Sequence, residues 1–358
     1  MREVLSREEW TRRERAHQDR VSRWTEPFLE RRSRGEKHPV EDFLFTYYTL
    51  SPAQFTRWHP GPGVLLLDAP ERADWKFYRP ATAAELAAAE LAATVGAPEF
   101  TAPAPELPDP EPRPHEPPAH APSAHDLPPH RPPSHATAAH EPTAPGAREA
   151  ASGVVVDADA FLAKRETAVK FTREILANTA AKTGTFDCFG LHEWAMAYRA
   201  DENGVRHENA ALRLGASGTD AVVEGHRIRC SHFDAFRFFQ PQAVERNELQ
   251  PTREAQRTME QPGCLHASMD LYKWAYKLLP AVDSELLADC FELAWDVRVT
   301  DMEASPYDLA DWGYEPVRIE TTEGKAEYVR RQRAFAARGT ELRHRLVTAT
   351  DRILAAAA

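Results

Sequence analysis

Four histidines of this chain lie close in sequence to a carboxylate, each within an unusually aromatic segment. The pairs are His38 with Asp42, His192 with Glu193, His232 with Asp234, and His266 with Asp270. Polar groups that are buried among aromatic rings must be paired. If the four segments pack together, one pocket gathers several imidazoles and carboxylates. Such a set suits a divalent metal such as iron, manganese or zinc, with His38, His192, His232 and His266 as ligands. It equally suits metal-free acid–base chemistry. In the alternative interpretation each pair is a separate structural hydrogen bond.

One of these pairs lies in the segment that we expect to be the centre of the fold, residues 261–280 (QPGCLHASMDLYKWAYKLLP). Its prolines and glycine leave room for about four helical turns. On such a helix His266, Asp270, Lys273 and Lys277 fall within an arc of about 60°, and most of the remaining surface is apolar. This narrow polar stripe either faces solvent, with ordinary helix-spaced pairs, or lines a cleft that has a carboxylate at its floor.

The elements that must position these residues are mainly helices. Ser6 and Glu9 form a capping-box pattern before an N-terminal helix. Residues 38–52 are too apolar for a surface element, and further helices are predicted at 159–179, from Asp283 onward, and at 325–354. The loose alternation at 206–230 predicts two or three strands. The expected fold is therefore α+β, mostly helical with a small antiparallel sheet.

Residues 96–150 differ sharply in composition from the rest of the chain. They are rich in proline and alanine, with histidines at every fifth position, at His115, His120, His125, His130, His135 and His140. Such a segment has few apolar groups to offset chain ordering, which predicts a disordered linker. Its histidines either bind divalent metal weakly or reflect a drifting repeat. We expect residues 1–95 and 151–358 to pack as one globular domain around this insertion.

Composition excludes several classes of protein. The net charge of −11 argues against a generally basic nucleic-acid binder, although not against a local basic cleft. No apolar run approaches the 18 or so residues that span a bilayer. The cysteines (Cys188, Cys230, Cys264 and Cys290) show no CxxC spacing. A cytoplasmic location without a membrane segment is therefore expected, and the oligomeric state is left open.

Familiar catalytic motifs are missing from the sequence. HExxH, GxSxG, GxGxxG and the P-loop pattern do not occur. The Gly-rich stretch LGASGTD at 214–220 is interpreted as a hairpin turn in preference to a phosphate-binding loop. The single ExxH, Glu341 with His344, is interpreted as a solvated helix-spaced pair.

Several long segments nevertheless resemble a bacterial family generally labelled 3-methyladenine DNA glycosylase. They are KHPVEDFLFTYY, CFGLHEWAMAYR, HRIRCSHFDAFRFF, QPGCLHASMDLYKWAYKL, ASPYDL and PVRIETTEGKAEYV. The resemblance covers roughly residues 1–80 and 155–355 and does not include the linker. It implies cleavage of the N-glycosidic bond of an alkylated base in DNA. The LPGVG-like hairpin of the helix-hairpin-helix glycosylases is absent, so no catalytic residue is transferred from that class.

This chemistry needs a pocket that stacks a flipped base and a carboxylate that activates water or stabilises an oxocarbenium ion. Candidate carboxylates are Asp270, Asp234 and Glu193, with His266 as an acid–base group. Candidate stacking and phosphate-contacting residues are Tyr47, Tyr48, Trp194, Phe236, Tyr276, Arg237 and Lys273. Two other classes remain open. They are a small-molecule enzyme, metal-dependent or not, in the same pocket, and a binding module with purely structural polar pairs.

Overall fold

The computed structural model describes residues 3–94, 152–205 and 210–355, so the linker prediction lies outside the described residues. The longer helices are α1 (Arg7–Ser33), α4 (Ala83–Thr94), α5 (Ala158–Ala180), α8 (Gly215–Gly225), α12 (Leu265–Lys277), α13 (Ser284–Glu303) and α14 (Thr322–Ala355). The short ones are α2 (Phe43–Tyr47), α3 (Pro52–Phe55), α6 (Leu191–Met196), α7 (Ala200–Asn203), α9 (Phe233–Phe236), α10 (Pro241–Val244) and α11 (Gln256–Met259), with 3-10 turns at Pro70–Arg72 and Ala310–Trp312. The strands are β1 (Glu3–Leu5), β2 (Val64–Leu67), β3 (Tyr78–Pro80) and β4 (Gly153–Val156). A mostly helical fold with one small sheet confirms the expected fold class.

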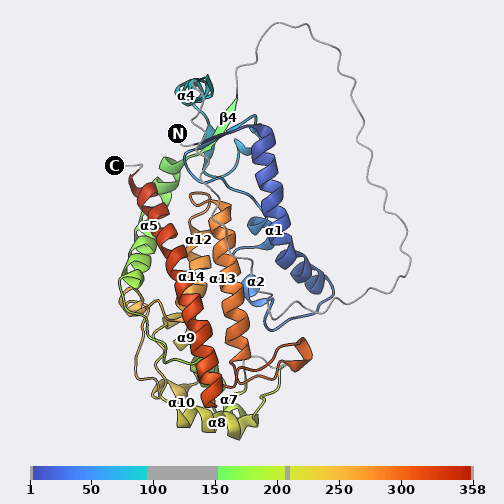
Figure 1. The fold of residues 1–358 in the computed structure, drawn as a ribbon, viewed down its shortest axis with the longest axis vertical. Coiled ribbons are helices and arrows are strands. Elements are labelled where there is room, and N and C mark those ends of the chain that lie inside the picture. The colour runs from blue at the N-terminus through green and yellow to red at the C-terminus, as the bar shows by residue number, and fades with distance from the viewer. Residues whose placement is uncertain (1–2, 95–151, 206–209, 356–358) are drawn as a thin grey trace, which may run out of the picture.

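The sheet lies at the end of the molecule that holds α4 and the beginning of α1 (Figure 1). Its strand order is β1-β2-β4-β3, with a parallel β1–β2 pair and antiparallel β2–β4 and β3–β4 pairs. The sheet is therefore mixed, and it is built from the regions on both sides of residues 95–151. Alternate side chains point to opposite faces. Leu66 and Val154 pack with Trp10 of α1 on one face, whereas Leu65 and Val155 pack with α4 on the other.

The strands predicted at residues 206–230 are not found in the described part of that region. Residues 215–225 form α8 instead, and only isolated bridges occur at Leu212 and Ile228. The predicted hairpin turn LGASGTD is wrong for the same reason, because its glycines fall in the first turns of this helix. The buried face of α8 consists of Thr219, Val222 and Val223, which are spaced as on one side of a helix. The surrounding sequence also alternates loosely between apolar and polar residues, and this alternation led to the prediction of strands.

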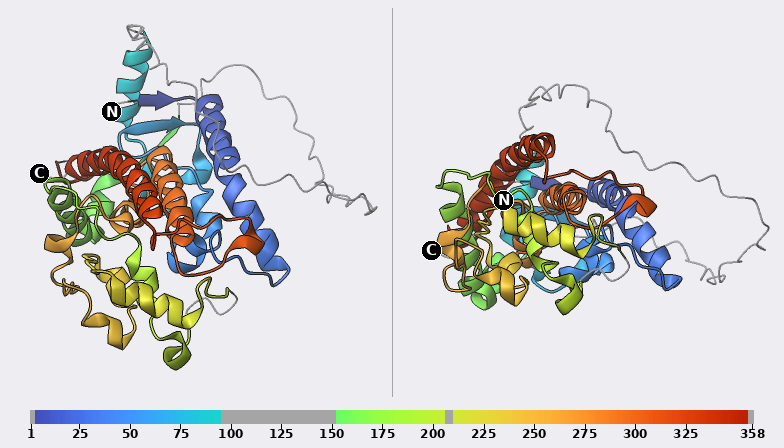
Figure 2. Two further views of the ribbon diagram at one scale, coloured as in Figure 1. Left: turned by 60° about the horizontal axis from the view of Figure 1, so that its bottom comes forward. Right: turned by 90° about the horizontal axis from the view of Figure 1, so that it is seen from below.

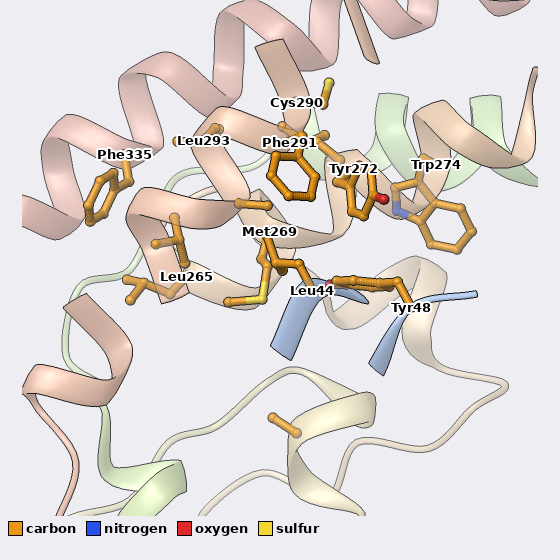
Figure 3. Close-up of a cluster of buried hydrophobic side chains, with 14 of the residues drawn as sticks. Leu44, Tyr48, Leu265, Met269, Tyr272, Trp274, Cys290, Phe291, Leu293 and Phe335 are labelled. Carbon is orange, nitrogen blue, oxygen red and sulfur yellow. The ribbon is translucent and has the colours of Figure 1, made fainter. Parts of the chain in front are cut away.

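Helices α5, α12, α13 and α14 form a bundle, with α1 beside α13 (Figures 1 and 2). The expected central helix spans Leu265–Lys277, close to the predicted bounds. Gly263 precedes this helix at a position where the chain passes close to residue 185. A larger residue would not fit there, because a Cβ would lie 2.3 Å from the Thr185 carbonyl oxygen. Figure 3 shows Met269 and Tyr272 of α12 against Phe291 of α13, with Leu44 and Tyr48 of the α2 region on the other side.

Several local predictions are confirmed. Ser6 and Glu9 form the capping box of α1, and Asp283 caps α13 through its side chain. The helix predicted at residues 325–354 is found as α14, which buries Tyr328, Phe335, Leu342, Leu346 and Ile353.

Candidate functional site

Most of the polar stripe of α12 faces the interior. Asp270 is 2% exposed and Lys273 is 9% exposed, so the interpretation of these positions as a solvent face is wrong, whereas Lys277 at the end of the helix is exposed. Around it lie His192 of α6, the N-cap residue His232 of α9, Glu260 after α11, and Asp301 of α13. Residues that are distant in the sequence thus bring three imidazoles and several carboxylates into one buried group.

His192 forms a closed hydrogen-bonded pair with Asp301. Its Nε2 lies 2.8 Å from Asp301 Oδ1, and both side chains are almost completely buried. Burial opposes the imidazolium form, but the Asp301 carboxylate holds the pKa of His192 well above its ordinary value. The guanidinium of Arg298 lies 3.4 Å from both Asp301 Oδ2 and Glu193 Oε1. The charged hydrogen bond between protonated His192 of α6 and Asp301 of α13 therefore links these two helices.

His232 has a different environment. Its Nε2 lies 3.3 Å from Asp270 Oδ2 and 3.4 Å from Glu260 Oε1, yet neither oxygen is placed to form a hydrogen bond with it. Its Nδ1 has no hydrogen-bond partner either, although the side chain is only 1% exposed. This imidazole is close to two carboxylates and bonded to neither.

His266 lies between the other two histidines. Its ring centroid is 4.4 Å from that of His192, edge to face, and 5.2 Å from that of His232, nearly parallel. Burial and the neighbouring His192 lower the pKa of His266 well below its ordinary value, so this ring is neutral. Three imidazoles in contact thus connect the Asp301 and Asp270 carboxylates.

Asp270 has both of its oxygens engaged. The Tyr48 hydroxyl donates to Oδ1 at 2.9 Å, and Lys273 Nζ donates to Oδ2. Lys273 also contacts Asp234 Oδ2 at 3.1 Å. Burial alone would raise the pKa of Asp270, but the Lys273 ammonium dominates and lowers it, so the side chain is a carboxylate. Asp234 is paired on its other side with Arg237, at 3.2 Å.

A cavity of about 20 Å³ opens beside this group. A volume of this size holds roughly one water molecule. Its polar lining includes Glu193, His232 and Asp270, and its aromatic lining comes from the half-buried rings of Phe43, Tyr47 and Phe238 together with Tyr48. Glu193 is 5% exposed, and its Oε2 has no hydrogen-bond partner.

The structure separates the predicted stacking residues into two sets. Tyr47 and Tyr48 line the cavity, whereas Trp194 is fully buried in the core and donates from Nε1 to the Ala304 carbonyl at 2.8 Å. Phe236 packs on Phe239, and its near neighbour Phe238 takes the place at the cavity. Tyr276 lies outside the cavity, where its hydroxyl is 3.3 Å from that of Thr49.

His38 is not brought to the site. Its Nδ1 accepts hydrogen bonds from the backbone N–H groups of Val40 and Glu41, at 3.3 and 3.0 Å. Asp42 binds the His38 backbone N–H and pairs with Arg31 at 2.7 Å. This pair is a local structural arrangement in the turn before α2.

The partners of the other histidines differ from their sequence neighbours. His192 pairs with Asp301 and not with Glu193, because adjacent residues of a helix point in different directions. Asp301, Arg298 and Glu260 were missed by the sequence interpretation. Asp301 and Arg298 have opposite charges and are three residues apart among the apolar residues Val297, Val299 and Met302 of α13, which is a signal that buried charges are paired. Glu260 lies in a polar connection and carries no such signal.

A larger groove of about 1010 Å³ runs between α5 and α12. Lys164, Arg165, Arg253 and Lys277 contribute positive charge to its lining, and Glu166 is the single acidic residue there. The lining also contains the aromatic side chains Phe161, Phe171, Trp274 and Tyr276. The groove adjoins the buried group through α12, which carries Trp274 and Tyr276 as well as Asp270 and Lys273.

Comparisons with protein-family models, curated proteins and solved structures find no match to this chain. Among the described residues, no helix combines the length and apolarity that crossing a membrane requires.

Proposed function

We propose that this protein is a cytoplasmic hydrolase that cleaves the N-glycosidic bond of an alkylated purine in DNA, with Glu193 as the carboxylate that activates water. The substrate class comes from the resemblance of the quoted segments. The observation that carries the catalytic assignment is the buried Glu193 Oε2, which lacks a partner beside a cavity the size of one water molecule. A carboxylate oxygen in that setting is suited to accept a proton from a bound water.

The other two candidate carboxylates are less suited to this role. Asp270 accepts from Tyr48 and Lys273, and Asp234 is held between Lys273 and Arg237. Carboxylates whose two oxygens are both paired are weaker bases and are less available to water, whereas Glu193 contacts Arg298 through Oε1 alone. We therefore assign Asp270 and Asp234 to the positioning of Lys273 and to the electrostatic balance of the site.

The surrounding charges fit a substrate whose alkylated base is cationic before the glycosidic bond breaks. An alkylated purine leaves as a neutral base, so the reaction needs negative charge near the sugar more than it needs a strong acid. The aromatic rings of Phe43, Tyr47 and Phe238 offer electron-rich faces to a cationic base. The cavity has room for about one water molecule and is too small for a base. The proposal therefore requires these half-buried rings to move apart when a base enters.

The basic groove supports a nucleic-acid substrate. Four cations against one carboxylate provide a local contact surface for phosphates, although the whole chain is acidic. Aromatic residues between such cations are typical of surfaces that bind unpaired strands.

The experiment is an excision assay on a duplex that carries a single 3-methyladenine analogue. Wild-type protein is expected to release the base, and Glu193→Gln to lower the rate at least about 100-fold, within the usual range for general-base groups. The matched control is Glu202→Gln, which changes an exposed carboxylate of α7. If the wild-type protein releases no base, the proposed function is wrong. If Glu193→Gln is as active as the control, the assignment of Glu193 is wrong.

A small-molecule enzyme is the second candidate, and the size of the cavity favours it. Space for one water beside a deeply buried group suits a small substrate better than a purine. Protein that fails on every DNA substrate but hydrolyses free nucleosides or small esters in a Glu193-dependent manner would support this candidate instead.

A further inference from the structure

We propose that His232, Glu260 and Asp270 form a binding site for one divalent transition-metal ion such as zinc, manganese or iron. The three side chains offer ligand atoms that all lie within 4.8 Å of one another. This set differs from the ligands expected from the sequence, because it includes Glu260 and Asp270 and excludes His38, His192 and His266.

The separations of these atoms fit a tetrahedral ion. Ligands at about 2.0–2.2 Å from a tetrahedral zinc ion are about 3.3–3.6 Å apart. His232 Nε2 lies 3.3 Å from Asp270 Oδ2 and 3.4 Å from Glu260 Oε1. These distances are too long for good hydrogen bonds and correspond to the edges of a coordination polyhedron.

The direction of the imidazole supports the same conclusion. His232 is 1% exposed, and its Nε2 forms a hydrogen bond with neither carboxylate although both are close. A buried nitrogen in this position leaves a polar group unsatisfied unless something lies between it and the oxygens. A cation bound by all three groups satisfies them together.

The surrounding residues hold the proposed ligands in place. Gln256 Nε2 donates to Glu260 Oε1 at 2.7 Å, while Tyr48 and Lys273 donate to the two oxygens of Asp270. Such contacts orient carboxylate ligands. Glu260 and Asp270 bring two carboxylates to the same imidazole, and the Lys273 ammonium that binds Asp270 is shared with Asp234.

The second histidine group is not an equivalent site. His192 Nε2 already forms a 2.8 Å hydrogen bond with Asp301, and Arg298 lies beside that carboxylate. The cavity that holds Glu193 is lined by His232 and Asp270, so a water bound to the ion would face Glu193. This catalytic use of the ion rests on the proposed function, whereas metal binding itself does not.

The experiment measures metal binding by the full chain. The linker histidines are first replaced by serine in all proteins, because they could bind metal independently. After treatment with a chelator, each protein is titrated with Mn²⁺, followed by electron paramagnetic resonance, and with Zn²⁺ against a chromophoric chelator. We expect one ion per chain and coupling of the bound Mn²⁺ to one imidazole nitrogen.

Variants locate the site. Glu260→Gln and His232→Gln are each expected to weaken binding by more than the roughly 100-fold that loss of an outer-shell contact costs. The controls Glu202→Gln and His344→Gln, which change the same residue types at exposed positions outside the site, should stay within about 10-fold of the starting protein. Circular dichroism shows whether each variant is folded. If both ligand variants unfold, the number of ions bound per chain and the coupling of Mn²⁺ to an imidazole nitrogen in the linker-substituted protein test the proposed site.

The proposal is overturned if the linker-substituted protein binds no ion, or if Glu260→Gln and His232→Gln bind as tightly as the controls. Its failure is distinguishable from that of the proposed function. Base excision by metal-free protein would remove only a catalytic role for the ion, and metal binding without excision would contradict only the glycosylase assignment.

Discussion

Charge is buried among aromatic rings at two places in this molecule, and the two places differ in how completely it is paired. Beside the sheet, the guanidinium of Arg72 is 1% exposed and lies 4.9 Å and 4.6 Å from the ring centroids of Trp10 and Trp75. It donates to the Trp58 carbonyl at 2.8 Å and to Glu14 at 2.7 Å. Beside the polar face of α12, Glu193 Oε2 and His232 Nε2 are also buried and have no hydrogen-bond partner.

The difference separates a structural role from a functional one. A buried charge that has all its hydrogen-bond partners does not require a ligand. Its contribution is to the stability of the fold, because removing one partner leaves an uncompensated buried charge. A buried polar atom without a partner costs stability, and a fold retains it where a ligand, a water or an ion supplies the missing contact. The Arg72 site therefore has its partners in place, whereas the site beside α12 has polar atoms left to bind a ligand, a water or an ion.

The largest effect on stability is expected from Arg72→Met. Removing the guanidinium leaves Glu14 and the Trp58 carbonyl without their partner in a largely buried site. Loss of one member of a buried pair costs about 3–5 kcal/mol, and the partial exposure of Glu14 places the expected value near 3. Urea denaturation measures the free energy of unfolding. Metal binding should be unchanged while the protein is folded, and a loss of both together would show that the two sites are not independent.

Asp301→Asn is expected to cost about 2–3 kcal/mol, because a charged hydrogen bond to His192 is lost in the interior. The matched control is Asp296→Asn on the same helix, where an exposed ion pair with Arg338 contributes at most about 1 kcal/mol. Equal losses of unfolding free energy in the two variants would contradict a closed His192–Asp301 pair.

The pH dependence of stability tests His59, which contacts Trp75 and Tyr78 beside Arg72. Burial, with Arg72 and Arg57, lowers the pKa of His59 to about 3. The unfolded chain therefore binds this proton more tightly, and stability that is complete above about pH 6.5 is lost as the pH falls toward 3. Between pH 7 and pH 5 the wild-type protein should lose roughly 1–2 kcal/mol more than His59→Asn does. Parallel stability curves from urea denaturation would show that His59 titrates normally.

The smallest effect on stability is expected from Glu193→Gln. The amide keeps an oxygen for the contact with Arg298, whose guanidinium also faces Asp301, so the unfolding free energy should change by less than about 1 kcal/mol while base excision is lost. Loss of base excision without loss of stability would distinguish Glu193 from Arg72, whose replacement is expected to lower stability. A loss of about 3 kcal/mol or more would instead make Glu193 a structural residue.

The elements of the fold could largely be predicted because their signals are local. The capping residues Ser6 and Asp283 and the apolar runs of α5, α12 and α14 are confirmed at nearly the expected positions. The sheet was only partly predictable, since β1 and β4 are three and four residues long and are paired through partners far away in the sequence. In a short segment the periodicity of a strand cannot be distinguished from that of a helix. For the same reason the region of α8 was predicted as strands although it forms a helix.

The composition of the site could be predicted better than its pairing. The sequence indicated that His192, His232 and His266 are near carboxylates, and the structure brings these three together with Asp270 and Glu193. Their actual partners, Asp301 and Glu260, come from other elements, because side-chain direction is set by tertiary packing and not by proximity in the chain.

The order of the strands bears on how the polypeptide can be divided. Because β4 lies between β2 and β3, the part of the chain that follows residue 151 is held on both edges by the part that precedes residue 95. A protease cut between these positions would leave two fragments associated through the sheet and through the contact of α1 with α13. The two fragments, produced as separate polypeptides, are therefore expected to assemble into a working complex.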